Sequence, residues 1–441
     1  MSGRAVLTVP VTGADGRPLL DPLRDALCGA GPAVLPRAGT APVPPWLIEP
    51  LAADEDDPRD PTAALVTTTG STGAPRAVLL PASALLASAA ATHDHLGGSG
   101  RWLLAVPAHT VAGVMVLVRS LVAGTTPVAL DLTDGFDPAR FAAAAETLGG
   151  RQRRYTSLVP TQLRRLLVAP GRAGREARAA LVSFDAVLVG GAALDAGTRE
   201  RAEALGVGVV ETYGMTETCG GCVYDGTALP GVRVDVEPPL GRVVVSGPVV
   251  ARGYRRDPAA PGGDHGAPDA AGGGFGDDVV PGGPRCFRTT DRAVVEGGRL
   301  RVLGRLDDVV VCGGTNVALD AVAAAARTVP GVTDALAVGL PDDSWGTVVG
   351  LVLVPDDDGA TREVMPRAVT AVRDRVGRAA TPHRVVLVDA LPVAGVGKPD
   401  RAAAVRLLAA AGAAPRTTPD AGMGDHGRQD HAPPEQEDEH P

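Results

Sequence analysis

Short apolar runs alternate with alanine-rich stretches from about residue 62 onward, and this alternation constrains the fold more than any other feature of the chain. Each apolar run has the length of a buried strand, and each alanine-rich stretch has the length of a helix. The predicted strands are residues 63–67, 102–106, 186–189 and 207–211, and the predicted helices are residues 81–95, 138–148, 161–167 and 196–205. This order predicts an α/β fold with largely parallel sheets.

Composition divides the chain into a large and a small part. Residues 1–60 form a Pro-rich lead-in with little periodicity, and the large domain extends to residue 304. Within it, the Gly-, Pro- and Asp-rich residues 257–284 are predicted to be a disordered insertion. We expect a hinge at 305–308, a compact α+β domain at 309–411 and a disordered acidic tail at 412–441.

Bulk properties exclude several classes of protein. No stretch approaches the ~20 apolar residues of a membrane helix, and the N-terminus is too short and too mixed for a signal peptide, which favours a cytoplasmic enzyme. With a net charge of −9 and 3% aromatic residues, no nucleic-acid surface is expected. Of the five cysteines only Cys219 and Cys222 have ligand-like spacing, and we expect them to shape a pocket rather than to bind zinc.

Residues 67–78, TTTGSTGAPRAV, follow an apolar strand and have the character of a phosphate-binding loop. Gly70 and Gly73 allow a tight turn that brings backbone N–H groups toward an anion. The neighbouring hydroxyl groups, from Thr68, Thr69, Ser71 and Thr72, add further donors. The segment lacks the Gly-Lys-[Ser/Thr] ending of a Walker A loop, and an ordinary Gly/Thr-rich turn is the alternative.

Three further segments have residue types suited to nucleotide binding. In residues 211–218, ETYGMTET, Thr216 stands beside Glu217, and a hydroxyl next to a carboxylate can hold Mg²⁺ with the phosphates that it bridges. A capped helix start is the alternative. The glycine pair at residues 190–191 would let a flat ring approach the backbone, and the carboxylate of Asp291 suits the two hydroxyl groups of a ribose.

Lys398 is the single lysine among 42 basic residues. Arginine therefore serves wherever a generic positive charge is needed, and the lysine calls for a role that a planar guanidinium cannot fill. A compact ammonium on a flexible stem can reach a negative charge that develops during a reaction. We therefore predict that Lys398 is catalytic.

Taken in order, these motifs resemble those of the adenylate-forming, AMP-binding superfamily of acyl-CoA synthetases and adenylation domains. The family's phosphate loop is matched at residues 69–77 with Arg76 in place of its Lys, and its Tyr-Gly-x-Thr-Glu is matched at 213–217. Its Thr-Gly-Asp corresponds to 289–291, its Gly-Arg-x-Asp-Asp hinge to 304–308, and its Gly-Lys-x-x-Arg to 397–401. The resemblance covers roughly residues 60–405.

The resemblance implies a large nucleotide-binding domain and a small mobile domain that uses ATP, Mg²⁺ and coenzyme A. It assigns catalysis to Lys398, Glu217 and Thr216, and the metal to Glu217. The residues that it assigns to ATP are Thr68, Thr69, Gly70, Ser71, Thr72, Gly73, Arg76, Gly190, Gly191, Ala192, Thr212, Tyr213, Gly214, Thr216, Asp291, Arg305 and Lys398. The hinge and the coenzyme A side involve Asp307, Gly313 and Gly314.

Four segments, at residues 107–113, 157–163, 188–193 and 216–222, resemble more specifically the o-succinylbenzoate–CoA ligases of menaquinone biosynthesis. By that similarity, Arg119 would meet the aromatic carboxylate of the acid, unless it is a helix-surface arginine. The residues implied for the acid are Thr68, His109, Thr110, Ala112, Arg119 and Gly190. The chain departs from the family at Thr110, where a His is usual, and its N-terminal part is short.

The implied reaction joins a carboxylate to ATP, releases pyrophosphate and then transfers the acyl group to coenzyme A. One rival hypothesis is a ligase for another acid, or an enzyme that loads a carrier protein. A second is a non-catalytic binding paralogue, which Arg76 and Thr110 favour and which Lys398, Glu217 and Asp291 oppose. A homodimer is left open.

Overall fold

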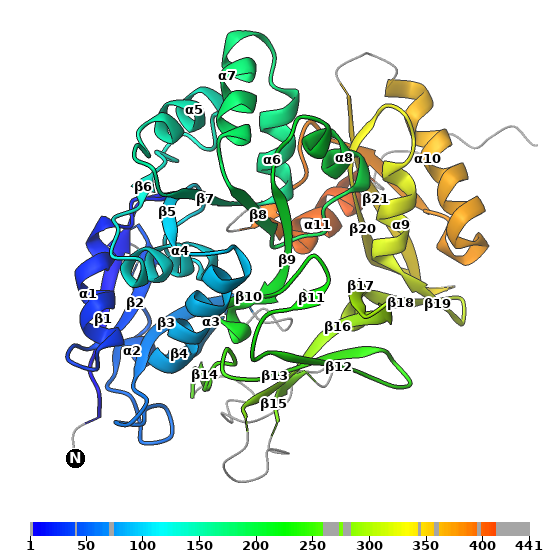
Figure 1. Cartoon of the computed structure of the whole chain (residues 1–441). Coiled ribbons are helices and arrows are strands. Elements are labelled where there is room, and N and C mark those ends of the chain that lie inside the picture. The colour runs from blue at the N-terminus through cyan, green and yellow to red at the C-terminus, as the bar shows by residue number, and fades with distance from the viewer. Residues whose placement is uncertain are drawn as a thin grey trace, which may run out of the picture.

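The computed structural model describes residues 3–39, 42–69, 75–258, 273–276, 284–342, 345–356, 361–394 and 398–411. A large domain contains three sheets, and a small domain formed by the C-terminal elements packs beside it (Figure 1). The two-domain α/β organisation expected from the sequence is therefore present. Among the described residues, no helix is both long and apolar enough to span a membrane.

The central sheet has seven strands in the order β11-β10-β9-β8-β7-β5-β6. Its strands are β5 (Gly100–Leu104), β6 (Val128–Ala129), β7 (Arg153–Leu158), β8 (Ala186–Gly190), β9 (Val209–Met215), β10 (Gly220–Tyr224) and β11 (Thr227–Ala228). The pairs from β6 to β9 are parallel, whereas β9, β10 and β11 pair antiparallel. Four helices, α5 (Pro138–Glu146), α6 (Pro160–Val168), α7 (Gly171–Val182) and α8 (Ala196–Ala204), pack on one face.

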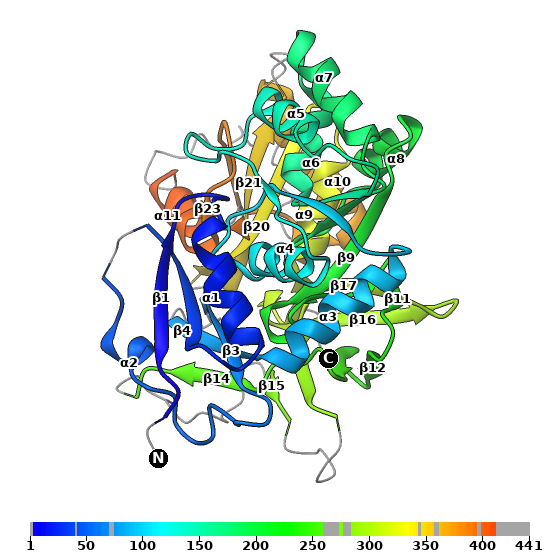
Figure 2. The same ribbon diagram turned by 60° about the vertical axis from the view of Figure 1, so that its left-hand side comes forward.

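The opposite face is covered by α1 (Arg17–Leu27), α3 (Ala82–His95) and α4 (Val111–Val122), which share one core with a second, N-terminal sheet (Figure 2). That sheet consists of β1 (Val6–Val11), β2 (Ala33–Ala38), β3 (Thr62–Thr69), β4 (Pro75–Pro81) and β14 (Gly253–Arg256), and the short α2 (Pro45–Ile48) packs beside it. Residues 1–60, in which the sequence showed little periodicity, therefore supply two parallel strands and an amphipathic helix to this layer.

The third sheet is antiparallel, and the prediction of a uniformly disordered insertion at 257–284 is wrong for part of it. Its strands are β12 (Arg233–Glu237), β13 (Arg242–Ser246), β15 (Gly274–Phe275), β16 (Cys286–Glu296) and β17 (Arg299–Arg305). β15 lies inside the predicted insertion. The centre of its Phe275 ring lies 5.0 Å from that of Tyr254 and 4.9 Å from that of Phe287, and this packing accounts for a strand at this position. Residues 259–272 and 277–283 lie outside the described residues.

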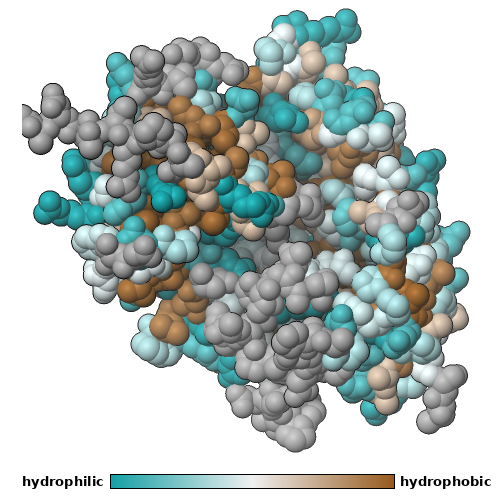
Figure 3. All heavy atoms as spheres, turned by 180° about the vertical axis from the view of Figure 1, so that it is seen from behind, coloured by the Kyte–Doolittle hydropathy of each residue, from teal (hydrophilic) through white to brown (hydrophobic). Residues whose placement is uncertain are grey.

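The small domain follows the single 3₁₀ turn η2 (Leu306–Asp308). It contains the hairpin β18 (Val309–Cys312) and β19 (Thr315–Ala318), the sheet of β20 (Val332–Asp342), β21 (Gly346–Pro355) and β22 (Arg384–Leu387), the hairpin β23 (Val393–Ala394) and β24 (Lys398–Pro399), and the helices α9 (Leu319–Arg327), α10 (Thr361–Val376) and α11 (Arg401–Ala411). Seen from behind, hydrophobic side chains gather on its face (Figure 3), and Val393 and Leu407 are among its exposed apolar residues. The predicted tail, 412–441, lies outside the described residues.

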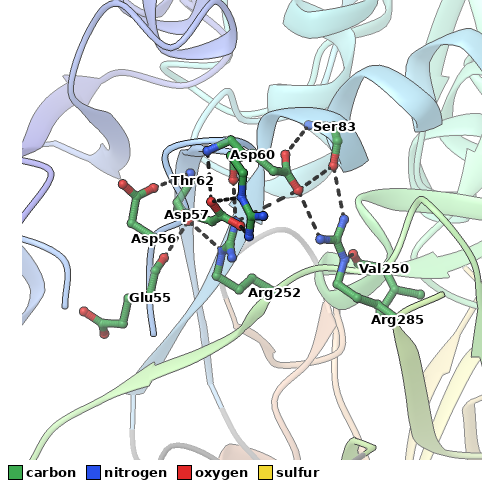
Figure 4. Close-up of polar contacts among 10 residues, drawn as sticks. Glu55, Asp56, Asp57, Asp60, Thr62, Ser83, Val250, Arg252 and Arg285 are labelled. Carbon is green, nitrogen blue, oxygen red and sulfur yellow. Dashed lines mark hydrogen bonds and ion pairs between the residues drawn. The ribbon is translucent and has the colours of Figure 1, made fainter. Parts of the chain in front are cut away.

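A polar network joins the layers of the large domain around Asp60 (Figure 4). The Asp60 carboxylate accepts hydrogen bonds from Ser83 at the start of α3, at 3.0 Å from N and 2.8 Å from Oγ. It also accepts one from Arg285, just before β16, at 3.1 Å. Arg252 donates to the carbonyl oxygen of Asp60 and to Thr62. Burial raises the pKa of Asp60, but these hydrogen bonds outweigh it and lower the pKa, and they connect the start of β3 to α3 and to the residues before β16.

Candidate active site

The predicted nucleotide residues of two motifs lie at one edge of the central sheet. Gly190 ends β8, and Thr212 to Met215 form the last residues of β9, its parallel neighbour. The carboxyl ends of parallel strands are where α/β sheets bind ligands. At Gly190 a Cβ atom would lie 2.2 Å from Thr212 Oγ1, and Gly191 has a φ of +81°, so both positions require glycine. Ala192 follows in the exposed turn.

Glu217 lies in η1 (Thr216–Thr218), directly after β9, and is buried. Tyr254 on β14 donates its hydroxyl hydrogen bond to Glu217 Oε1 at 2.7 Å, and Arg76 on β4 donates to the same oxygen from Nη2 at 3.4 Å. The Arg76 guanidinium also stacks 3.9 Å from the centre of the Tyr254 ring. The N-terminal sheet therefore supplies a cation and a hydroxyl to the carboxylate predicted to hold magnesium.

This geometry corrects one expectation. The resemblance places Arg76 in the phosphate loop, where its charge would be exposed, but Arg76 lies in β4 with 13% of its side chain exposed. Its partner strand β3 ends in Thr68 and Thr69, in register with Arg76 and Pro75. Gly70, Ser71, Thr72 and Gly73, the predicted phosphate loop itself, lie outside the described residues, as does the side chain of Thr69.

Asp291 on β16 contacts the predicted nucleotide-binding segment 211–218 directly. The Tyr213 hydroxyl donates a hydrogen bond to Asp291 Oδ2 at 2.7 Å, and the Asp291 amide donates to Thr289 Oγ1 at 2.9 Å. Burial and the neighbouring carboxylate raise the pKa of Tyr213. Two predicted ATP residues that are 78 positions apart in the sequence are thus joined.

Thr110, where the family has His, is the N-cap of α4. Its Oγ1 accepts a hydrogen bond from the Gly113 amide at 3.3 Å and donates to the Pro107 carbonyl at 2.9 Å. Threonine is a favoured residue at this position because its oxygen satisfies a free N–H of the first turn. The departure from the family therefore has a structural role, and the adjacent His109 and Ala112 flank it at the same end of the helix.

Arg119 lies two turns farther along α4 and is 3% exposed, so it is not a helix-surface arginine. Its Nη2 lies 3.4 Å from the Tyr224 hydroxyl, and its guanidinium lies 5.2 Å from the Trp102 ring. Among the described residues, no carboxylate lies within ion-pair distance of it. Burial lowers the pKa of Arg119, and both burial and the Arg119 charge lower the pKa of His93.

Several polar atoms near the predicted acid site are buried and have no hydrogen-bond partner among the described residues. Three belong to residues assigned to the acid: Thr68 Oγ1, His109 Nδ1 and Arg119 Nε. Burial lowers the pKa of His109. Unsatisfied buried groups are rare in folded proteins and are expected where a ligand supplies the missing partner.

The residues predicted for the hinge and the coenzyme A side lie at the end of β17 and beyond it along the chain. Arg305 ends β17, in register with Asp291, and Asp307 lies in η2. Gly313 and Gly314 form the tight turn of the β18–β19 hairpin, and a Cβ atom on Gly313 would lie 2.3 Å from the Trp345 ring. Lys398 lies in β24, and its side chain is outside the described residues.

Cys219 and Cys222 are packing residues rather than reactive thiols. Cys219 and Cys222 are free and buried on either side of the turn into β10. Burial raises the pKa of the Cys219 thiol, and it raises the pKa of Cys222 to about 12. Thiols of this kind are unreactive, which agrees with a packing role.

The residues present fit a magnesium ion held mainly by phosphate. Among the described residues, no group of three or more His, Cys, Asp or Glu side chains could enclose a metal. Mg²⁺ is commonly bound by one or two carboxylates together with the phosphates of its nucleotide. Glu217 provides one such carboxylate directly after β9, and it contacts Arg76 on β4.

Sequence reasoning missed Tyr254, Tyr224 and Trp345. Tyr254 and Tyr224 contact Glu217 and Arg119 from strands far away in the sequence, so no local motif contains either pair. A compositional signal did exist, because the chain has only four Tyr and three Trp. In a chain this poor in aromatic residues, each one is a candidate for a specific contact.

Known proteins share both the sequence and the fold. The family model described as AMP-binding enzyme matches residues 32–255, and that of the AMP-binding enzyme C-terminal domain matches residues 321–398. A probable 2-succinylbenzoate–CoA ligase from Mycobacterium tuberculosis is 43% identical over 357 residues, which cover 79% of this chain and 85% of that protein.

Two solved structures resemble this chain in fold. One is the Escherichia coli MenE with a bound analogue of OSB-AMS, with a TM-score of 0.64 and 24% identity over 93% of this chain and 89% of that one. The other is the Bacillus subtilis o-succinylbenzoate coenzyme A synthetase in complex with ATP and magnesium ion, with a TM-score of 0.59 and 23% identity over 78% of this chain and 70% of that one.

Proposed function

Because this chain belongs to the family of AMP-binding enzymes and is an AMP-forming acid–CoA ligase, we propose that the acid it activates is 2-succinylbenzoate. The product would be 2-succinylbenzoyl-CoA, an intermediate of menaquinone biosynthesis. The acid has two carboxylates, one on the aromatic ring and one at the end of the succinyl chain. The ligase has to bind one of them and activate the other.

The observation that carries the choice of acid is the buried charge of Arg119. A buried guanidinium is costly unless a carboxylate pairs with it, and no described residue provides one. We propose that the ring carboxylate of the substrate is that partner, with the Tyr224 hydroxyl beside it. Thr68, His109, Thr110, Ala112 and Gly190 would then surround the rest of the acid.

In the first half-reaction, the succinyl carboxylate attacks the α-phosphorus of ATP, a new P–O bond forms, and pyrophosphate leaves. We propose that Arg76 and the 69–73 loop hold the β- and γ-phosphates, while Asp291 and Tyr213 hold the ribose and base side of the nucleotide. Glu217, with Thr216, would hold Mg²⁺, which supplies positive charge to the phosphate oxygens when bound.

Lys398 is proposed to stabilise the negative charge that develops between the carboxylate and the α-phosphate. This stabilisation is electrostatic, and its loss is expected to lower the rate of adenylation by about 10²–10³-fold. In the second half-reaction, the small domain rotates about Asp307 and brings Gly313 and Gly314 to the coenzyme A side. The thiol then attacks the acyl carbon, and AMP leaves.

An assay of the purified full-length chain tests the proposal. Acid-dependent pyrophosphate release from ATP is measured over a panel of acids with and without coenzyme A. We expect 2-succinylbenzoate to be the best substrate and 4-oxo-4-phenylbutanoate, which lacks the ring carboxylate, to be much poorer. Equal rates for the two acids would overturn the assignment of the acid, and acyl transfer only to a carrier protein would overturn that of the acceptor.

The role of Lys398 is tested by Lys398→Ala in the two half-reactions separately. Adenylate formation should fall, whereas coenzyme A should still react with supplied 2-succinylbenzoyl-AMP at nearly the wild-type rate. Lys398→Arg distinguishes a requirement for a compact ammonium from a requirement for any cation. Equal loss of both half-reactions in Lys398→Ala would show that Lys398 acts on the fold rather than on adenylation.

A further inference from the structure

One arginine connects the hinge to the lysine hairpin. Arg401, the first residue of α11, donates from Nη2 to Asp308 Oδ2 at 2.5 Å. Asp308 ends η2, directly after the predicted pivot Asp307, and is 7% exposed. Arg401 also contacts Asp320 Oδ1 at 3.4 Å and the Ala337 carbonyl at 3.4 Å. A residue 93 positions from the hinge is therefore held against it.

The same arginine is rigidly connected to Lys398 through the backbone. β24, which contains Lys398, pairs with β23, and the Asp400 amide donates to the Pro392 carbonyl at 2.7 Å. Asp400 then caps α11, since its Oδ1 accepts from the Ala403 amide at 2.8 Å. Only Pro399 and Asp400 separate the lysine from Arg401, and both are fixed by these hydrogen bonds.

The contact also reaches the large-domain side of the hinge. Gly304, the residue before Arg305, has a φ of +129°, and a Cβ atom there would lie 2.8 Å from Asp320 Oδ2. Asp320 therefore lies between Gly304 and Arg401. A cavity of about 460 Å³ adjoins Asp308 and Arg401, so the ion pair does not rest on tight apolar packing. The orientation of the Arg401 side chain toward Asp308 therefore depends on the attraction between the two charges.

We propose that Arg401 is a positioning residue for adenylation, which fixes the Lys398 hairpin to the hinge so that rotation about Asp307 carries both as one rigid arm. The proposal rests on the proposed function of Lys398. Without the ion pair, the hairpin and α11 keep their own hydrogen bonds but lose their fixed position relative to the pivot. A misplacement of ~1 Å at a reacting centre can lower a rate by roughly 10²-fold.

The experiment compares four full-length variants in the two half-reactions. They are Arg401→Met, Lys398→Ala, the charge-exchanged double variant Arg401→Asp with Asp308→Arg, and Arg406→Met, a matched control on the exposed side of α11. Adenylation is followed by 2-succinylbenzoate-dependent ATP–pyrophosphate exchange. Acyl transfer is followed by thioester formation from supplied 2-succinylbenzoyl-AMP and coenzyme A.

In Arg401→Met we expect exchange to fall by about 10–10²-fold while thioester formation changes by less than about twofold. Arg406→Met should resemble wild type, and the charge-exchanged variant should recover exchange above the level of Arg401→Met. Unchanged exchange in Arg401→Met, alongside lost exchange in Lys398→Ala, would overturn the positioning role and leave the proposed function intact.

Equal loss of both half-reactions in Arg401→Met, or no recovery in the double variant, would also overturn the proposal, because either result indicates a general structural role. Normal exchange in Lys398→Ala would instead overturn the function assigned to Lys398, and with it the inference about Arg401. The failures are thus distinguishable. Thermal unfolding of each variant establishes that the small domain remains folded.

Discussion

Arg76 and Arg119 are both arginines withdrawn from solvent within the large domain, but their surroundings are opposite. Arg76 pairs with Glu217 and stacks on Tyr254, so the protein itself compensates its charge. Arg119 contacts an aromatic ring and a hydroxyl group, and among the described residues no carboxylate pairs with it. Among the described residues, the protein therefore compensates the charge of Arg76 but not that of Arg119.

This contrast would allow one site to bind a nucleotide and to select an acid by different means. If Arg76 and Glu217 bind Mg²⁺ and ATP as we propose, the two side chains can remain paired until the nucleotide arrives with its own charge. If Arg119 binds the ring carboxylate as we propose, a buried cation without a partner would disfavour any acid that lacks a second carboxylate. Stability is reduced where selectivity is required, as is common at functional sites.

The largest expected effect is that of Arg119→Met. The kcat/KM for 2-succinylbenzoate should fall by about 10²–10³-fold, because truncating one partner of a buried ion pair costs roughly 3–5 kcal/mol. The unliganded protein should be as stable as wild type or more stable, since an uncompensated charge is replaced by an apolar side chain. Steady-state kinetics and urea unfolding measure the two effects.

The control for this variant is a substrate rather than a residue. With 4-oxo-4-phenylbutanoate, wild type and Arg119→Met should have similar kcat/KM values, because the missing ring carboxylate removes the interaction from both. A variant that loses as much activity on this acid as on 2-succinylbenzoate, or that unfolds at lower urea concentration, would mean that Arg119 is structural.

Arg76→Met should have the opposite effect on stability. Glu217 would remain buried without its cation, and the free energy of unfolding should fall by about 3 kcal/mol. Arg76→Lys should retain most of the stability, and the double variant Arg76→Met with Glu217→Gln should recover much of the loss because both charges are then absent. If Arg76→Met unfolds at the same urea concentration as wild type, the two arginines do not differ as described.

A smaller effect is expected for Tyr254→Phe, which keeps the ring under Arg76 and removes only the hydroxyl group. The lost hydrogen bond to Glu217 Oε1 ends on a charged acceptor, and the free energy of unfolding should fall by about 1.5–2 kcal/mol. Tyr155→Phe is the matched control, since its hydroxyl donates to the neutral carbonyl groups of Leu96 and Gly98. If Tyr155→Phe costs more than Tyr254→Phe, Glu217 is not the stronger acceptor.

The sequence was sufficient for the parts of the molecule that are local. The predicted strands and helices from residue 63 to 211 correspond to β3, α3, β5, α5, α6, β8, α8 and β9, because periodicity and chain length specify them. Residues 1–60 were not recognised as two strands and a helix, because proline occurs in both strands and within α1. Largely parallel sheets were expected, yet all three large-domain sheets contain antiparallel pairs.

The candidate site likewise contains residues that a local motif predicts and contacts that no local motif predicts. Gly190, Thr212 and Glu217 could be predicted because each belongs to a motif at a strand end. The pairing of Arg76 with Glu217, across 141 positions, and the burial of Arg119 against Tyr224, across 105, depend on which strands become neighbours. No local pattern contains that information, and the same holds for the contact between Arg401 and Asp308.

The smallest effect expected is a pH dependence that reports the Arg119 charge through His93. Burial, and then the Arg119 charge, lower the pKa of His93 below its ordinary value of 6.5. The unfolded chain therefore binds a proton before the folded protein does. The stability that His93 contributes is complete above about pH 6.5 and is lost as the pH falls, by at most about 1.4 kcal/mol at one pH unit below that value. The buried His109 acts in the same direction, whereas the Asp side chains with lowered pKa values lose their contribution only at lower pH.

Urea unfolding at pH 7.5 and pH 5.5 measures this loss in wild type, His93→Gln and Arg119→Met. His93→Gln should reduce it, and Arg119→Met should reduce it as well, because the second cause of the lowered pKa is then absent. In wild type, saturating 2-succinylbenzoate should raise the pKa of His93, which the NMR titration of its Cε1 proton detects, since a bound carboxylate cancels the charge that the histidine senses. If the pKa of His93 is the same in Arg119→Met, in wild type and in the liganded protein, then Arg119 is compensated by the protein itself, and the contrast with Arg76 does not hold.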